Sequence, residues 1–219
     1  MPLGDPNRRA GGAEPVQGGQ MSSTNRSNAS ERHVSDYYVT SQLAIRDFLF
    51  AFNEDFPNLF DGKPFTILDP CAGGDAKHEM SYPAAIQKYS GWTFNGIDTC
   101  DVRPDSPAMF KEDYLFTNLG QDRPYDMAIT NPPFNIAIDV IQKCLREVAI
   151  GGWVIMLLRL NFYGSQERSA WFKQNMPTVS YIHSKRLSFT DDRKTDSIEY
   201  QHACWFVGEK PKFTKIRIL

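Results

Sequence analysis

The sequence predicts an α/β protein with a doubly wound, mostly parallel sheet and an antiparallel strand near its C-terminus. Short apolar segments alternate with segments whose apolar residues repeat every three or four positions, which is typical of βαβ units. The run at 153–160 is almost entirely apolar, as in a strand covered on both faces. The last two long strand segments have no helix between them, which indicates antiparallel pairing at the sheet edge.

Each element follows from a local pattern. Helical spacing predicts helices at 40–53, 80–90, 135–150 and 165–176, the second with Pro83 in its first turn and the third ended by Gly151 and Gly152. Apolar runs bounded by turn residues predict strands at 65–68, 92–98, 107–113, 125–130, 153–160, 178–184 and 199–208, with an edge strand at 214–219.

The N-terminal segment differs from the rest in composition. Residues 1–32 are rich in Gly, Ser, Asn, Arg and Pro, so we expect a disordered extension. Met21 is a second candidate start, which would place residues 1–20 outside the natural chain. Residues 33–219 have the length of one domain.

Composition argues against several classes of protein. No apolar run approaches the roughly 20 residues of a membrane span, and the N-terminus lacks the apolar stretch of a secretory signal. The cysteines are scattered singly, which suits a reducing cytosol and argues against a zinc or CxxC redox site. We therefore expect neither a membrane partner nor a metal.

Charge is distributed unevenly along the chain. Residues 36–150 carry a net charge of −8, whereas residues 151–219 carry +5. A basic C-terminal third suits contact with a polyanion, although ordinary surface variation explains the asymmetry equally well.

Polar residues and glycines follow the first four predicted strands, at the edge where open α/β sheets bind ligands. The first strand leads into DPCAGGD, the second ends in GID, the third in ED, and the fourth leads into TNPPF. The glycine segment is not G-x-G-x-x-G and no Walker lysine follows it, which disfavours a pyrophosphate ligand.

The acids at these strand ends describe a nucleoside without phosphates. Asp98 is expected to accept hydrogen bonds from ribose hydroxyls, and Asp113 from an adenine amino group. Gly73 and Gly74 let the backbone approach a ligand closely, and Asp69 suits a cationic or zwitterionic tail. S-adenosylmethionine fits this description.

Taken in order, DPCAGG, GID, ED and NPPF resemble the motifs of the class I S-adenosylmethionine-dependent methyltransferases, which have a Rossmann-like fold. The Asn-Pro-Pro-aromatic run is similar to that of the amino-methyltransferases. Segment 35–49 resembles the one before the first strand in DNA adenine-N6 methyltransferases, and 186–208 resembles the tail of small phage-type enzymes. The resemblance covers about residues 35–208.

The resemblance implies two groups of site residues. Those expected to bind S-adenosylmethionine are Tyr38, Thr40, Asp69, Pro70, Ala72, Gly73, Gly74, Asp98, Asp113 and Tyr114. Those expected in catalysis are Asn131, Pro132, Pro133 and Phe134. Oxygens of Asn131 and Pro132 would accept the two N–H groups of an exocyclic amine, and Phe134 would stack on the base.

The implied substrate is the N6 amino group of an adenine flipped out of DNA. The candidates for contacts to the DNA backbone are Arg159, Arg168, Lys185, Arg186, Arg193 and Lys194. Arg159 ends an apolar strand, where an unpaired charge is costly, so we expect an acidic partner or the substrate beside it. The implied location is the cytoplasm of a bacterial or phage-infected cell.

Other functions share the four-residue motif. RNA base methylation, at adenine N6 or guanine N2, is the main alternative, and protein glutamine methylation is a weaker one. A non-catalytic binding module is a third, against which the complete NPPF run argues. Only 62 positions separate Asp69 from Asn131, which leaves no space there for a recognition domain. The sequence does not indicate which DNA sequence is recognised or whether the protein forms a homodimer.

Overall fold

The computed structural model describes residues 39–120, 123–189 and 197–219, all within one compact unit, and the predicted extension at 1–32 lies outside them. The strands are β1 (Phe65–Asp69), β2 (Phe94–Thr99), β3 (Tyr125–Thr130), β4 (Val148–Arg159), β5 (Val179–Ile182), β6 (Tyr200–Phe206) and β7 (Lys215–Ile218). The α-helices are α1 (Gln42–Asp55), α2 (Ser81–Tyr89), α3 (Ala137–Glu147) and α4 (Gln166–Phe172). Short 3₁₀ turns are η2 (Leu59–Gly62), η3 (Tyr114–Phe116) and η4 (Leu160–Gly164).

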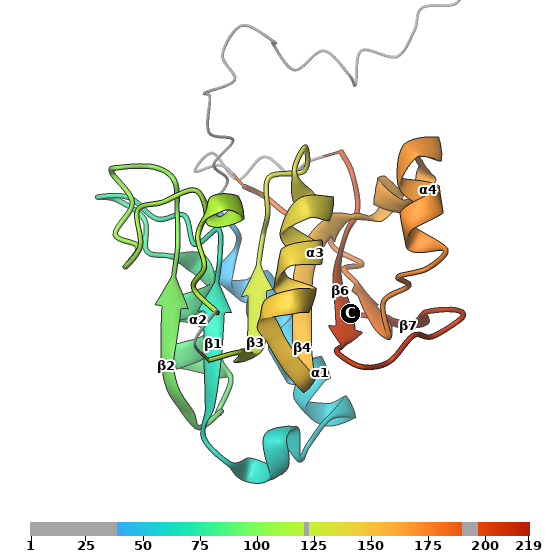
Figure 1. Cartoon of the computed structure of the whole chain (residues 1–219), viewed down its shortest axis with the longest axis horizontal. Coiled ribbons are helices and arrows are strands. Elements are labelled where there is room, and N and C mark those ends of the chain that lie inside the picture. Colours follow the sequence, from blue (N-terminus) through green and yellow to red (C-terminus); the bar gives the residue numbers. More distant parts are fainter. Residues whose placement is uncertain (1–38, 121–122, 190–196) are drawn as a thin grey trace, which may run out of the picture. The chain divides into compact units, whose positions relative to one another are not determined.

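The strands form one sheet in the order β2-β1-β3-β4-β6-β5-β7 (Figure 1). Strand β6 is antiparallel to β4 and β5, whereas the other neighbouring pairs are parallel. The predicted sheet with its antiparallel strand near the C-terminus is confirmed. The reversed strand lies inside the sheet, however, and the edge belongs to β7.

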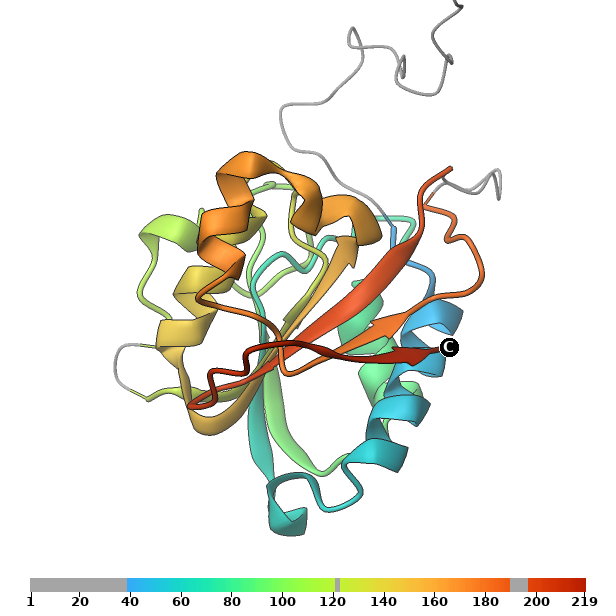
Figure 2. The same ribbon diagram turned by 90° about the vertical axis from the view of Figure 1, so that its right-hand side faces the viewer.

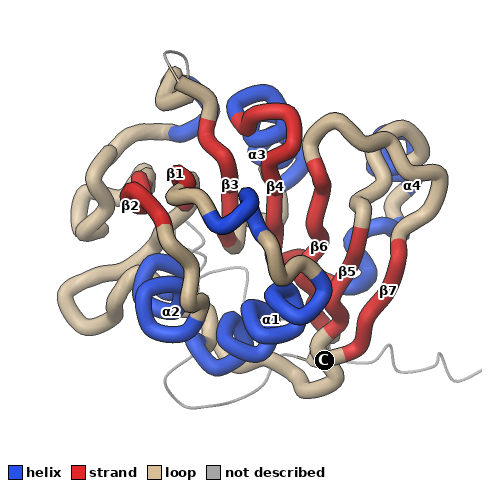
Figure 3. The backbone as a smooth tube through the Cα atoms, turned by 90° about the horizontal axis from the view of Figure 1, so that it is seen from below, coloured by secondary structure: helices blue, strands red, loops and turns tan. Residues whose placement is uncertain are grey.

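Helices cover both faces of the sheet, as Figures 2 and 3 show. Helices α1 and α2 pack on one face, against side chains such as Ile67 and Met127. Helix α3 and part of α4 pack on the other, against Leu68 and Ala128. Successive strand residues thus enter different cores, which explains why β1, β3 and β4 read as continuous apolar runs. Among the described residues, no helix is long and apolar enough to cross a membrane.

One expected element is absent, and another ends earlier than expected. Residues 107–113 form no strand, and only an isolated bridge joins Phe110 to Cys100. The predicted helix 135–150 ends at Glu147, and β4 starts at Val148, so that Gly151 and Gly152 lie within the strand. A Cβ on Gly152 would lie 2.3 Å from the Asp126 carbonyl oxygen, so this glycine permits close strand packing and does not end a helix.

Candidate functional site

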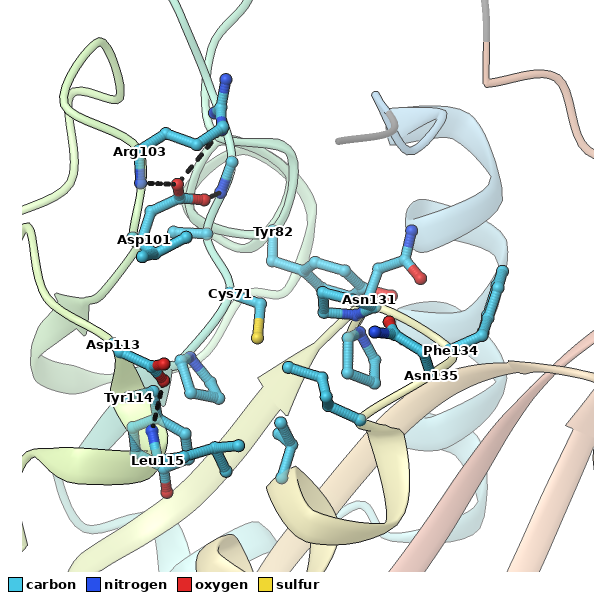
Figure 4. Close-up of a pocket in the computed structure, with 18 of the residues that line it drawn as sticks. Cys71, Tyr82, Asp101, Arg103, Asp113, Tyr114, Leu115, Asn131, Phe134 and Asn135 are labelled. Atoms are coloured by element: carbon cyan, nitrogen blue, oxygen red, sulfur yellow. Dashed lines mark hydrogen bonds and ion pairs between the residues drawn. The ribbon is translucent and has the colours of Figure 1, made fainter. Parts of the chain in front are cut away.

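A cleft of about 540 Å³ opens beyond the carboxyl ends of β1, β2 and β3 (Figure 4). It brings together most of the predicted site residues: Thr40, Pro70, Ala72, Gly73, Asp113, Tyr114, Asn131, Pro132, Pro133, Phe134 and Arg159. Asp69, Gly74, Asp98 and Arg186 do not line it. Tyr38, Arg193 and Lys194 lie outside the described residues. In Figure 4, the acids stand on one side of the cleft, and Asn131 and Phe134 on the other.

The glycine loop after β1 is held in a left-handed conformation. Gly73 and Gly74 have φ values of 66° and 77°, which side chains with a Cβ adopt at a cost. The Gly73 N–H donates to Asp101 Oδ2 over 2.9 Å, and the Ser106 hydroxyl donates to the Gly73 carbonyl over 2.6 Å. Arg103 Nη2 donates to the Gly74 carbonyl over 2.6 Å. The loop is thereby fixed from the segment that follows β2.

The acid beside this loop is Asp101 rather than the predicted Asp98. Strand β2 continues past Asp98, whose Oδ2 accepts a 2.7 Å hydrogen bond from the Tyr125 hydroxyl, away from the cleft lining. Asp101 lines the cleft, and its Oδ1 accepts from the N–H and Nε of Arg103 over 2.9 and 3.1 Å. The sequence contains a signal for this shift. Thr99 and Cys100 are uncharged and extend the strand pattern past Asp98, so the next acid, Asp101, is the one that follows the strand.

Asp69 lies beneath the loop and is almost completely buried, with 1% of its surface exposed. Its Oδ1 accepts a 3.3 Å hydrogen bond from the Cys71 N–H. Its Oδ2 has no hydrogen-bond partner among the described residues. Burial raises the pKa of Asp69 to about 7, although the neighbouring Thr130 side chain and the Cys71 N–H act in the opposite direction. A buried carboxylate oxygen without a donor is a place where a bound cationic group would be stabilised.

Cys71 contributes a thiol to the cleft, and Figure 4 shows its sulfur in the middle of the drawn residues. Burial raises the pKa of Cys71 well above its usual value, and the charge of Asp69 adds to this shift. The thiol is therefore protonated at neutral pH and is a poor nucleophile.

The side of the cleft that contains Asp113 and Tyr114 is held in place by contacts with α3. Asp113 Oδ1 accepts from the Leu115 N–H over 3.0 Å and begins η3. The buried Tyr114 donates its hydroxyl to Glu147 Oε2 over 2.7 Å. Lys143 Nζ lies 2.7 Å from Glu147 Oε1 and donates to the Thr117 carbonyl over 2.6 Å. Helix α3, which follows NPPF, therefore fixes both sides of the cleft.

The TNPPF segment leaves β3 and turns directly into α3. The Pro133 carbonyl accepts a 3.1 Å hydrogen bond from the Ile136 N–H, which closes the turn. The Asn131 side-chain Nδ2 donates to the Thr40 hydroxyl over 3.1 Å. Two consecutive prolines fix the backbone dihedral φ and remove two N–H donors, so the carbonyl of Pro132 has a direction set by the chain.

Phe134 and Arg159 are in contact. The guanidinium carbon of Arg159 lies 4.5 Å from the centre of the Phe134 ring, a cation–π arrangement. Arg159 Nε also approaches the Tyr200 hydroxyl at 3.5 Å. These two contacts of Arg159 are aromatic. The expected acidic partner or substrate beside it stays a prediction. The guanidinium now covers part of the ring on which a base was expected to stack.

The other predicted basic residues have different surroundings. Arg186 lies 3.5 Å from Glu199 in an exposed ion pair. Arg168 donates to the Phe162 carbonyl over 2.7 Å and covers the Phe162 ring. Arg168 thus has a packing role.

A buried polar chain, unrecognised in the sequence, starts at the cleft wall. Tyr82 lines the cleft, and its hydroxyl lies 3.0 Å from His202 Nε2. His202 Nδ1 lies 2.9 Å from His183 Nε2. The Phe48 ring stacks on the His202 ring, with 4.1 Å between the ring centres. Burial lowers the pKa of His183 to about 4 and that of His202 well below its usual value. No spacing pattern could have linked residues so far apart in sequence.

Comparisons with solved structures identify the fold. A Listeria monocytogenes protein assigned to the class I S-adenosylmethionine-dependent methyltransferases matches with a TM-score of 0.54 and 14% identity; the match covers 78% of this chain and 64% of that one. A Streptococcus thermophilus protein named as a hemolysin matches with a TM-score of 0.52 and 11% identity, over 81% of this chain and 69% of that one. The M protein of the type I restriction enzyme EcoKI gives a TM-score of 0.49 and 13% identity, over 84% and 49% of the two chains.

No family model and no curated protein matches the sequence. The chain has the Rossmann-like fold of the class I methyltransferases. In the part of the chain that the structure describes, no group of three His, Cys, Asp or Glu side chains is placed to hold a metal ion.

Proposed function

We propose that this protein transfers a methyl group from S-adenosylmethionine to the N6 amino group of adenine in DNA. The observation that carries the proposal is the pairing of two loops across one cleft. The glycine loop after β1 and the NPPF loop after β3 line the same cavity, at the end of the sheet where such folds bind ligands.

The residues of the first loop fit S-adenosylmethionine, which when bound supplies an electrophilic methyl group. The cleft volume is within the range of small-molecule sites, which is roughly 300–1,000 Å³. Asp101 would hold the ribose hydroxyls, and Asp113 and Tyr114 would flank the adenine ring. The unpartnered carboxylate oxygen of Asp69 suits a nearby cationic group. The fold shared with the Listeria protein supports the same cofactor.

The residues of the second loop fit an exocyclic amine as methyl acceptor. The lone pair of such an amine is delocalised into the ring, which makes the nitrogen a weak nucleophile. Acceptors at Asn131 Oδ1 and the Pro132 carbonyl would hold both N–H groups and localise the lone pair on nitrogen. Bound S-adenosylmethionine would supply the methyl group to this nitrogen, and the extra proton of the amine would leave to solvent. Phe134 would support the base by stacking.

DNA is proposed as the substrate because the C-terminal third is basic and the motif resembles that of adenine-N6 enzymes. Arg159 lies in the cleft itself, between NPPF and the C-terminal part of the sheet. The base must leave the duplex to reach a cleft of this kind, at a cost of a few kcal/mol.

Incubation with labelled S-adenosylmethionine and DNA, transfer RNA or protein tests the proposal. Digestion of the DNA should release labelled N6-methyladenine. Label in an RNA nucleoside would move the assignment to RNA, and label in a glutamine side chain to protein. No label in any acceptor, with S-adenosylmethionine bound, would mean a binding module.

A further inference from the structure

Asn131 has a partner that the motif itself does not contain. Its amide nitrogen donates to Thr40 Oγ1 over 3.1 Å, across 91 positions of sequence. Both residues line the cleft. The resemblance to class I methyltransferases implies only that Thr40 contacts the cofactor. The hydrogen bond adds a second relationship, to the residue proposed to accept the substrate amine.

The support beneath Thr40 is rigid. Thr40 is 2% exposed and lies just before α1, whose first backbone hydrogen bond runs from the Ile45 N–H to the Ser41 carbonyl over 3.1 Å. Phe48 and Phe52 on this helix are completely buried in the core. The hydroxyl is therefore buried two positions before a helix that the core holds in place.

An amide needs such a support more than a carboxylate does. One end of the Asn131 amide is a donor and the other an acceptor, and rotation by 180° about the last side-chain bond exchanges them. An exocyclic amine needs the acceptor. The Thr40 hydroxyl can accept or donate, and in the observed rotation it accepts from the NH₂ group, so the oxygen is the end left for the substrate. A carboxylate has two equivalent oxygens and presents an acceptor in either rotation.

We propose that Thr40 is a positioning residue, which orients the Asn131 amide so that its oxygen meets the substrate amine. This inference rests on the proposed function, because it deepens the role of Asn131 in that reaction. It predicts that the contribution of Thr40 depends on which side chain occupies position 131.

A double-mutant cycle tests the inference. Thr40→Val keeps the shape of the side chain and removes the hydroxyl, whereas Thr40→Ser keeps the hydroxyl. Single-turnover methyl transfer to the acceptor found in the product analysis should fall about three- to tenfold in Thr40→Val, the scale of one neutral hydrogen bond. Thr40→Ser should retain most of the rate. In the Asn131→Asp background, Thr40→Val should have little further effect.

Nuclear magnetic resonance provides a readout that does not need activity. The Asn131 side-chain NH₂ signals, assigned by their loss in Asn131→Asp, should shift in Thr40→Val and keep their positions in Thr40→Ser. Unmoved signals in Thr40→Val would overturn the inference, as would an equal loss of rate in both backgrounds, which would indicate a general packing or cofactor role. A parent protein that methylates nothing would overturn the proposed function, and this inference with it.

Discussion

At the scale of single residues, two carboxylates near the end of β2 are only three positions apart and have different partners. Asp98 accepts from Tyr125, while Asp101 accepts from the glycine loop and lines the cleft. Asp101→Ala should therefore weaken S-adenosylmethionine binding by about 1–3 kcal/mol, because a charged acceptor is lost together with the hydrogen bond that it accepts from the Gly73 N–H. Asp98→Asn, the matched control, should leave the affinity nearly unchanged. Calorimetry distinguishes them, and the reverse order would return the ribose role to Asp98.

Asn131 and Phe134 should act on the acceptor and not on the cofactor. Asn131→Ala removes one fixed acceptor of the amine, and we expect about 10²–10³-fold slower transfer. Phe134→Ala removes stacking, which is worth about 1–3 kcal/mol per base, and Phe134→Tyr should retain much of the activity. Both alanine variants should bind S-adenosylmethionine almost as the parent does. Single-turnover methylation beside a cofactor titration measures this. Parent-like transfer by Asn131→Ala would make TNPPF a structural turn.

Asp69 gives a pH dependence with a defined sign. Its pKa is about 7 in the folded protein against an ordinary value of 3.8, so its stabilising contribution is full below about pH 4 and is lost as the pH rises through 7. Asp69→Asn stays neutral and can still accept from Cys71. It should raise the melting temperature relative to the parent at pH 8, and less at pH 5. Thermal unfolding at both values is the test, and an equal shift at the two would contradict the assignment.

At the scale of elements, η3 depends on α3 for its position. Tyr114→Phe removes the hydroxyl that donates to the charged Glu147, and we expect a loss of about 1–3 kcal/mol in the free energy of unfolding. Tyr163→Phe is a matched control, because that hydroxyl donates to the neutral Gln201 over 3.2 Å, and about 0.5–1.5 kcal/mol is expected. Urea unfolding measures both. A larger loss in Tyr163→Phe would argue against the anchoring role of Glu147.

Most elements could be predicted from the sequence because their apolar patterns have clear ends. Helix α2 lies within one position of its expected bounds, and β3 coincides with 125–130. The failures occurred where tertiary contacts decide the outcome. Val148–Ile150 fit the helical period, but Val148 pairs with Tyr125 of β3, and the strand begins there. Residues 107–113 contain apolar side chains, yet their β pairing is limited to one bridge, between Phe110 and Cys100.

The TNPPF side of the cleft was easier to place from the sequence than the side that contains Asp101. TNPPF has a rigid backbone and a short motif, so its place followed from where β3 ends. Asp101 depended on the last residue of β2, and strand ends are poorly marked in sequence. Thr40 and the partners of Tyr82 depended on long-range packing, which a single sequence does not display.

At the scale of the whole molecule, one buried polar cluster connects two helices to two strands. It joins Phe48 of α1 and Tyr82 of α2 to His202 of β6 and to His183, which follows β5. Because burial lowers the pKa of His183 from 6.5 to about 4, the unfolded chain binds the proton first. Stability should therefore fall as the pH drops from about 6.5 to 4, by at most about 3 kcal/mol from this residue.

Denaturant titrations between pH 4 and 7 measure this dependence. His183→Gln should reduce the slope, and the part that remains is expected from His202, whose pKa burial also lowers. Tyr82→Phe is the control, because it removes one hydrogen bond and keeps both imidazoles, so it should lower stability at every pH without changing the slope. A slope in His183→Gln equal to that of the parent would assign the acid sensitivity to groups other than His183.

The sheet order also has a consequence for synthesis on the ribosome. Strand β4, whose residues 154–158 end up completely buried, has β3 as one neighbour and β6 as the other. The chain makes β3 first, but β6 emerges only after η4, α4 and β5. During that interval the nascent chain has a long apolar strand with an open edge, a state prone to aggregation. Translation of this middle region is thus the stage at which a chaperone that shields strand edges would protect the protein.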